Sequence, residues 1–187
     1  PTSIRVRRPA AYQNSGRQSR WIPRHIPWNA EIARLCGYYV AEGTLGPDLN
    51  YIRFTFATNE SDYQEDVSRI FEGVFGFTPT ILNSRRGTWV HLDIYNRALA
   101  QWFFKHFDHR SYNKRIPVWM QYADFHLQEE FLIGLLRGDG FYSEKKYFVD
   151  QRKSAKLFRT FRLTLSNPTL VYQTWQMLIR LGYEASI

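Results

Sequence analysis

The sequence predicts an α+β fold of two similar halves, each with the element order α-β-β-α-β-β-α and an antiparallel sheet. A nine-residue pattern occurs twice, as LCGYYVAEG at residues 35–43 and as LIGLLRGDG at residues 132–140. Each copy is followed by segments rich in aromatic and β-branched residues, and then by an amphipathic helix pattern. This repeated order predicts two pseudo-symmetric halves that pack together through the two motif helices.

The small residues of the two motifs predict close contact between these helices. Gly37 and Ala41 lie one turn apart on one helix face, and Gly134 and Gly138 take the matching positions in the second motif. A glycine inside a helix costs about 1 kcal/mol relative to alanine, and a close approach of two backbones explains its use here. Cys36, the only cysteine, lies within the first motif and is expected to be a small buried side chain.

Each motif ends in an acid followed by a glycine. We expect Gly43 and Gly140 to be left-handed helix caps, which places Glu42 and Asp139 at helix C-termini. An anion there faces the negative end of the helix dipole, and two anions brought together repel each other. A divalent cation would offset both effects, and oxygen ligands suit a hard ion such as magnesium. The alternative is an ordinary helix pair with exposed acids near its ends.

The rest of the first half alternates between strands and helices. We expect strands at residues 51–57, 77–82 and 88–94, a helix from a Thr58-Asn59 cap to residue 75, and a further helix at residues 97–107. Gly76 ends the first of these helices.

The second half repeats this order and then stops. Residues 141–149 and 157–165 are strand-like, and a helix begins at Ser166-Asn167-Pro168 and runs to about residue 181. Gly182-Tyr183 then corresponds to Gly76-Phe77, so most of the last hairpin and the closing helix are missing. Such a sheet would expose a strand edge. A truncation, a disordered tail and a second chain that completes the half all stay open.

With these two motifs the chain resembles the LAGLIDADG homing endonucleases, in the two-motif, single-chain form found free-standing and inside inteins. AEG and GDG are common endings of the family motif, and the resemblance covers roughly residues 20–187. It implies saddle-like sheets and final acids that bind the metals that cleave DNA. Glu42 and Asp139 are therefore expected to be catalytic residues and metal ligands, with Mg²⁺ or Mn²⁺ as the ion.

The connector carries a further likeness to intein-type members of the family. Asn113-Lys114-Arg115-Ile116-Pro117 precedes the second motif, and Arg24-His25-Ile26-Pro27 precedes the first at a different spacing. In the family, the lysine lies near the active site and helps to polarise the phosphate or the attacking water. Lys114 is the candidate for that catalytic role, and the alternative is a solvated loop lysine.

Composition and charge indicate a polyanionic partner. The net charge is +8 and the isoelectric point about 9.7. Residues 1–30 contain six arginines and no acid, which predicts either an arm that follows the DNA backbone or a merely basic tail. We divide the chain into this basic arm (1–28), a first half (29–109), a connector (110–128) and a second half (129–187). Zinc-ligand spacing, a signal peptide and a membrane-spanning run are absent from the sequence.

Double-stranded DNA is the expected partner, read by strands in the major groove. Alternation puts Arg53 on the polar face of residues 51–57, while residues 52, 54 and 56 suit a core. The candidate DNA-binding residues are Arg24, Arg53, Arg85, Arg86, Trp89 and His91 in the first half, and Lys145, Lys146, Arg152, Lys153, Arg159 and Arg162 in the second half.

These observations predict a site-specific, metal-dependent double-strand DNA endonuclease that leaves staggered ends. The main alternative is a catalytically silent LAGLIDADG-type DNA- or RNA-binding protein, such as an intron maturase or a transcription regulator. A third possibility is the endonuclease part of an intein. We expect an intracellular protein wherever its target DNA is, and a monomer unless a second chain completes the second half.

Overall fold

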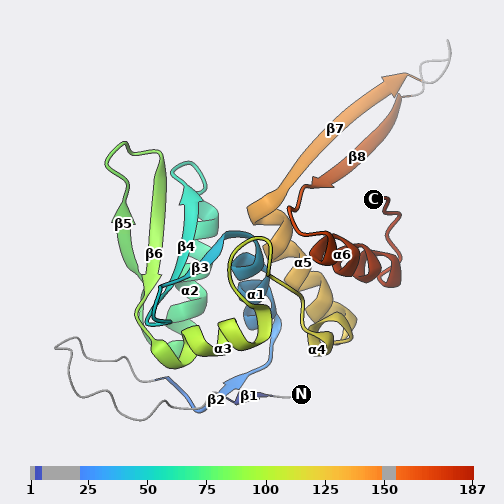
Figure 1. Cartoon of the computed structure of the whole chain (residues 1–187). Helices are drawn as coiled ribbons and strands as arrows, with labels where there is room; N and C mark the ends of the chain where they lie inside the picture. The colour runs from blue at the N-terminus through green and yellow to red at the C-terminus, as the bar shows by residue number, and fades with distance from the viewer. Residues whose placement is uncertain (1–2, 6–21, 149–154) are drawn as a thin grey trace, which may run out of the picture.

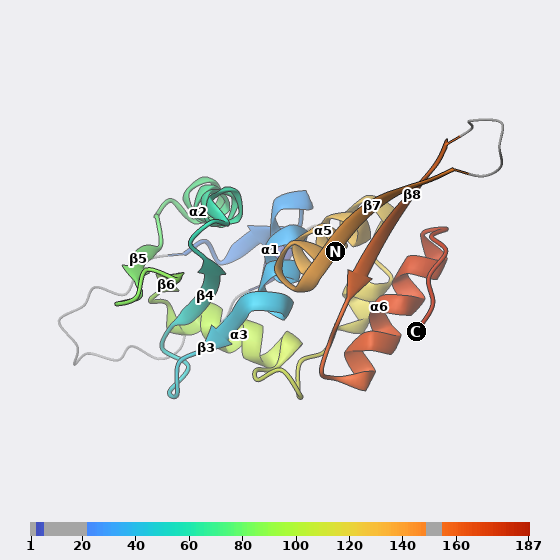
Figure 2. The ribbon, with the colours of Figure 1, turned by 90° about the horizontal axis from the view of Figure 1, so that it is seen from above.

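The computed structural model describes residues 3–5, 22–148 and 155–187, with side chains described for residues 22–144 and 160–187. At its centre, helices α1 (Ala30–Glu42) and α5 (Phe125–Asp139) lie side by side (Figures 1 and 2). Asn29 caps α1, because its side chain accepts a hydrogen bond from the Ile32 amide at 3.0 Å.

The two central helices touch backbone to backbone at the predicted glycines. A Cβ at Gly37 would collide with the Phe131 carbonyl oxygen, and a Cβ at Gly134 would collide with that of Arg34. A Cβ at Gly138 would overlap the Ala41 side chain. The predicted close packing of the two motif helices is therefore confirmed, and the two glycines cannot be replaced without moving backbone.

The prediction of left-handed caps at Gly43 and Gly140 is wrong. Both residues are extended, with φ −78° and ψ 138° at Gly43 and φ −95° and ψ 151° at Gly140. The chain passes straight from each helix into a strand, so no reversal is needed. Glycine serves a different purpose here, because a Cβ would collide with atoms of Tyr39 or Leu136 in the preceding turn.

The first half contains a four-stranded antiparallel sheet. Its strands β3 (Gly43–Leu45), β4 (Ile52–Ala57), β5 (Thr80–Asn83) and β6 (Trp89–Ile94) lie in the order β3-β4-β6-β5. Helices α2 (Ser61–Phe75) and α3 (Arg97–Phe107) complete the half. The observed order α-β-β-α-β-β-α confirms the prediction for this half, with an antiparallel sheet as expected.

An aromatic core holds the first half together. Tyr39 of α1, Phe54 of β4, Phe71 of α2 and Phe103 and Phe107 of α3 are all at most 1% exposed. The rings pack edge-on or tilted, for example Tyr39 against Phe103 with centroids 4.3 Å apart. Because α1 contributes to this core, its C-terminal end is fixed relative to the sheet.

Some boundaries differ from those expected from the sequence. Helix α2 begins at Ser61 after Glu60, with no side-chain cap from Thr58 or Asn59. The Glu60 carboxylate instead accepts a hydrogen bond from the Ala57 amide at 2.7 Å. Strand β5 begins at Thr80 rather than at residue 77.

The second half consists of α5, two strands and one further helix. Strands β7 (Gly140–Phe148) and β8 (Ala155–Leu163) form a two-stranded antiparallel ribbon that extends away from the rest of the molecule (Figures 1 and 2). Asn167 caps the start of helix α6 (Pro168–Arg180), because its side chain accepts a hydrogen bond from the Thr169 amide at 3.0 Å. This start and Pro168 at the first turn agree with the sequence prediction.

The connector packs between the two halves. It contains the short helix α4 (Val118–Gln121), and Gln173 of α6 bonds both the amide and the carbonyl of Ile116, at 2.8 and 3.1 Å. Near the N-terminus, β1 (Ser3–Arg5) pairs with β2 (His25–Pro27). Arg7, Arg8, Arg17 and Arg20 of the predicted arm lie outside the described residues. The division into arm, halves and connector stays a prediction. In the part of the chain that the structure describes, no helix is long and apolar enough to cross a bilayer.

Candidate active site at the ends of the motif helices

Glu42 and Asp139 are the last residues of α1 and α5, so the packing of these helices sets where both carboxylates lie. A Cβ at Gly138, next to Asp139, would lie 3.0 Å from Cγ of Glu42. Burial is the largest of the effects that raise the pKa of Glu42 to about 7, and the negative charge of Asp139 is the next. Burial also raises the pKa of Asp139 above its usual range. The two acids therefore form one half-buried site in which the ionised carboxylates are destabilised.

Lys114 lies next to this site and is only 4% exposed, so it is not a solvated loop lysine. Its ammonium group donates to the carbonyls of Tyr39 at 2.9 Å and Val40 at 2.8 Å, with Ala41 at 3.5 Å. Burial lowers the pKa of Lys114 to about 8, and the nearby charges of Asp139 and Glu42 oppose that shift. In this structure the lysine caps the C-terminal end of α1 and offsets the dipole that faces Glu42.

A charge cluster on Asp66 of α2 fixes the last turn of α5. The nearly buried Asp66 carboxylate accepts from Arg137 at 2.9 Å and Tyr38 at 3.1 Å, and pairs with Arg34 at 2.8 Å. Arg137 is two residues before Asp139, so this cluster ties the helix end that carries Asp139 to the first half. The sequence does not predict this cluster, because Arg34, Asp66 and Arg137 are far apart in the chain and none of them belongs to a recognisable motif.

The chemistry of the two carboxylates decides what ion could bind them. Among the described residues, no group of three or more His, Cys, Asp or Glu side chains could hold a metal ion. Magnesium is commonly bound through one or two carboxylates, with water and substrate phosphate oxygens as the other ligands. Burial disfavours the ionised form of both acids, and the positive charge of a bound cation would favour it. The pair of acids therefore fits that pattern.

The candidate DNA-binding residues of the first half do not all present a free charge. Arg53 makes a two-pronged ion pair with Asp93 of β6, with both N–O distances 2.7 Å, and the Asp93 side chain is fully buried. Thr55 and His91 form a cross-strand hydrogen bond at 3.0 Å. The guanidinium of Arg53 is thus already balanced inside the protein, which the alternation pattern alone did not reveal.

The remaining candidates are exposed where they are described. Arg85 and Arg86 lie in the turn between β5 and β6, Trp89 at the start of β6 is 48% exposed, and Arg24 precedes β2. Arg162 is exposed on β8. Lys145, Lys146 and Arg159 lie on the β7–β8 ribbon without described side chains, and Arg152 and Lys153 lie outside the described residues.

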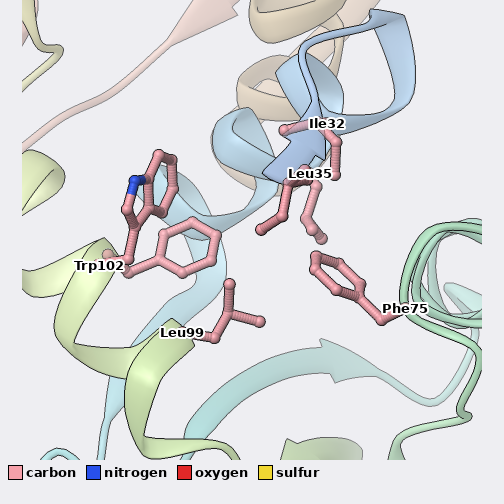
Figure 3. A pocket seen from close by; sticks show the side chains of 7 residues that line it. Ile32, Leu35, Phe75, Leu99 and Trp102 are labelled. Atoms are coloured by element: carbon pink, nitrogen blue, oxygen red, sulfur yellow. The ribbon is translucent and has the colours of Figure 1, made fainter. Parts of the chain in front are cut away.

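A separate shallow pocket lies between α1, α2 and α3 (Figure 3). It is lined by apolar side chains only, namely Ile26, Ile32, Leu35, Phe75, Leu99, Trp102 and Phe103. None of these side chains can act as an acid, base or metal ligand. The paired acids at the helix ends therefore stay the candidate active site.

The motif helices, their closing acids and the antiparallel sheet give the chain an α+β fold of the kind found in LAGLIDADG meganucleases. Residues 29–108 match the family model of a LAGLIDADG-like domain. The matched residues lie in the first half of the chain, which therefore contains a LAGLIDADG-like domain.

Several curated proteins contain a similar segment. The chain is 26% identical over 166 residues to an ATP-dependent DNA helicase of Thermococcus kodakarensis, covering 88% of this chain and 14% of that protein. It is 28% identical over 149 residues to an uncharacterized protein of Methanocaldococcus jannaschii, covering 78% of this chain and 19% of that one. It is 25% identical over 168 residues to an iron-sulfur cluster assembly SufBD family protein of Mycobacterium tuberculosis, covering 89% and 19%. The chain thus spans less than a fifth of these relatives.

Among solved structures, the chain resembles meganuclease I-SmaMI bound to uncleavable DNA. The TM-score is 0.51 at 13% identity, over 84% of this chain and 72% of that one. At this level of identity the likeness concerns the fold.

Proposed function

We propose that this protein is a site-specific double-strand DNA endonuclease that requires a divalent metal ion. The observation that carries the proposal is the pairing of Glu42 and Asp139 at the ends of two helices in backbone contact. The raised pKa of both acids supports it, because an enzyme site that binds a cation concentrates negative charge that is otherwise unfavourable.

Glu42 and Asp139 would hold Mg²⁺ or Mn²⁺ through carboxylate oxygens. When bound, such an ion lowers the pKa of water and stabilises the leaving oxygen of a phosphodiester. The acids themselves hold and orient the cation and need not act as general bases. Because each acid ends its own helix, each could serve one of the two DNA strands, and the family resemblance implies staggered ends with 3′ overhangs.

Lys114 supports this site from within the protein. Its hydrogen bonds to the α1 carbonyls hold the turn that carries Glu42, and its positive charge lowers the pKa of both acids. We infer that Lys114 positions the acids and keeps them ionised. This differs from the direct action on phosphate or water that the family resemblance suggests.

DNA would lie against the sheet and its turns, with the exposed Arg85, Arg86 and Trp89 at one end of the first half. The basic β7–β8 ribbon would contact the other half of the target. Lysine and arginine contacts to phosphates give salt-dependent affinity, and arginine also suits guanine edges in the major groove. The I-SmaMI structure, which holds DNA, supports this choice of partner through its shared fold.

We further infer that this unit occurs as a module inside larger proteins. Similar segments make up 14% of a protein named as a helicase and 19% of one named for iron-sulfur cluster assembly. Two proteins with such different names share this segment, which supports an inserted element such as an intein. The sequence on either side of the unit in its own gene would test this.

Cleavage of a randomised duplex library in the presence of Mg²⁺, followed by sequencing of the ends, tests the proposed activity. We expect discrete staggered ends that disappear in Glu42→Gln and in Asp139→Asn. Asp48→Asn, which neutralises an exposed acid in the loop before β4, is the matched control and should cleave normally. Tight binding without cleavage in either Mg²⁺ or Mn²⁺ would instead favour a silent DNA- or RNA-binding protein.

A further inference from the structure

Asn167, at the start of α6, connects the second half of the protein to Lys114. Its side-chain nitrogen donates to the Lys114 carbonyl at 2.7 Å, and its side-chain oxygen accepts from the Thr169 amide at 3.0 Å. Asn167 is 6% exposed and Lys114 is 4% exposed, so the bond between them lies away from water. One side chain therefore caps α6 and also holds the residue whose ammonium group contacts the end of α1.

Helix capping alone does not account for this arrangement. A cap uses the side-chain oxygen of the residue, and aspartate, serine and threonine are also common at this position. An ionised aspartate would cap α6 but has no hydrogen to donate to the Lys114 carbonyl. The cap needs an acceptor at residue 167, whereas the bond to Lys114 needs a donor on the same side chain.

The backbone that follows Lys114 is held by α6 as well. Gln173 bonds both the amide and the carbonyl of Ile116, and Gln121 donates to the same carbonyl at 2.7 Å. Residues 110–113, which precede Lys114, are all exposed, and the Lys114 amide bonds back to Arg110 at 3.2 Å. The buried anchors of the backbone around Lys114 thus include two side chains of α6.

We propose that Asn167 is a positioning residue that fixes the Lys114 backbone from the second half and so holds the lysine ammonium group at the end of α1. The ammonium group donates to the carbonyls of Tyr39 and Val40, in the turn that ends at Glu42. The packing of α6 in one half therefore orients the acid of the other half. This inference rests on the proposed role of Lys114 in the endonuclease site, and Asn167 acts only through Lys114.

Asn167→Asp separates the two roles of this side chain, because aspartate keeps the cap and loses the donor. The readout is the ¹H–¹⁵N NMR signal of the Lys114 ammonium group at pH 6, assigned by its absence in Lys114→Met. The pKa of Lys114 is about 8, so the group is protonated at that pH. Buried hydrogen-bonded protons exchange slowly with water. We expect a protected signal in the wild type and exchange that is about tenfold faster, or more, in Asn167→Asp.

Two further variants control this experiment. Asn29→Asp makes the same change at the cap of α1, at the opposite end of that helix from Glu42, and should leave the Lys114 signal protected. Gln173→Glu keeps the acceptor for the Ile116 amide and loses the donor to the Ile116 carbonyl. Its effect should be smaller than that of Asn167→Asp, because Gln121 still donates to this carbonyl. It also tests the contact with α6 if Asn167→Asp does not fold.

Cleavage of DNA connects the position of Lys114 to the reaction. Asn167→Asp should cleave about tenfold to a hundredfold more slowly than the wild type, with unchanged affinity for DNA. A Lys114 signal that stays protected in both Asn167→Asp and Gln173→Glu would overturn the proposal, and so would an equal loss of protection in Asn29→Asp. A full cleavage rate despite a lost signal would also overturn it. A wild type that cleaves no DNA would count against the proposed function, and the NMR signals, which need no DNA, would still decide whether Asn167 holds Lys114.

Discussion

Replacing Gly134 by alanine is the sharpest test of the contact between the motif helices. A Cβ there would collide with the Arg34 carbonyl oxygen and lie 2.9 Å from the Tyr38 amide nitrogen, and both are backbone atoms that no side-chain rotation can move. The helices would have to separate, and overpacking of this kind costs about 1–3 kcal/mol or more. Alanine favours the helix by about 1 kcal/mol, so the net loss is about 0–2 kcal/mol.

Gly73→Ala is the matched control, because Gly73 is also inside a helix but has no heavy atom within 4 Å of the point where a Cβ would lie. That variant should gain up to about 1 kcal/mol from helix propensity alone. The two alanine variants should therefore differ by about 1–3 kcal/mol in the free energy of unfolding, measured by urea denaturation. Equal stabilities for Gly134→Ala and Gly73→Ala would refute the backbone contact.

Three further predictions concern charged groups. The pKa of Glu42 is about 7 in the folded protein, above its ordinary value of 4.5, so the folded state favours the protonated form. The stability that this preference contributes is fully present below about pH 4.5 and is lost as the pH rises through about 7. Glu42→Gln should remove that loss and stabilise the protein by about 2 kcal/mol at pH 8 after allowance for partial exposure. Mg²⁺ should raise the melting temperature of the wild type but not of this variant, and a Mg²⁺ effect that persists would count against Glu42 as a ligand. Lys114→Met removes the ammonium donor from the carbonyls of Tyr39 and Val40 and should cost about 1–3 kcal/mol in urea denaturation without DNA; unchanged stability would contradict the capping role. Arg53→Ala leaves the buried Asp93 carboxylate without its ion-pair partner, although the Tyr95 hydroxyl still donates to it at 3.2 Å. The change should cost about 3–5 kcal/mol, whereas Arg85→Ala should change stability by less than about 0.5 kcal/mol. Similar losses in the two arginine variants would contradict the internal role of Arg53.

The sequence was sufficient to predict the central helices and the order of elements around them. Glycine spacing is informative because few other arrangements compensate for two glycines inside a helix, and Gly37 and Gly134 do lie at the contact. Helix α3 was predicted with its observed bounds because residues 97–107 carry a regular amphipathic pattern, and the structure adds the cap that Asn96 provides. The strand alternation of β4 predicted its buried face, with Ile52, Phe54 and Phe56 all at most 1% exposed.

Features that depend on distant residues could not be predicted. The glycine after each acid follows a common cap rule, but a strand continues at once and the tight contact with the preceding turn decides the conformation. The buried position of Lys114 depends on α1 carbonyls more than 70 residues away. The Arg53–Asp93 pair depends on the register between β4 and β6, which alternation within one strand does not contain.

The central claim is that α1 and α5 bring the carboxylates of Glu42 and Asp139 into one site. Carbon-13 NMR titration of the Glu42 carboxyl, in wild type and in Asp139→Asn, measures their interaction without any knowledge of the DNA target. We predict an apparent pKa near 7 for Glu42 in the wild type and a clearly lower value in the variant, because part of the shift comes from the charge of Asp139. The same Glu42 pKa in both proteins would mean that the two acids do not share a site.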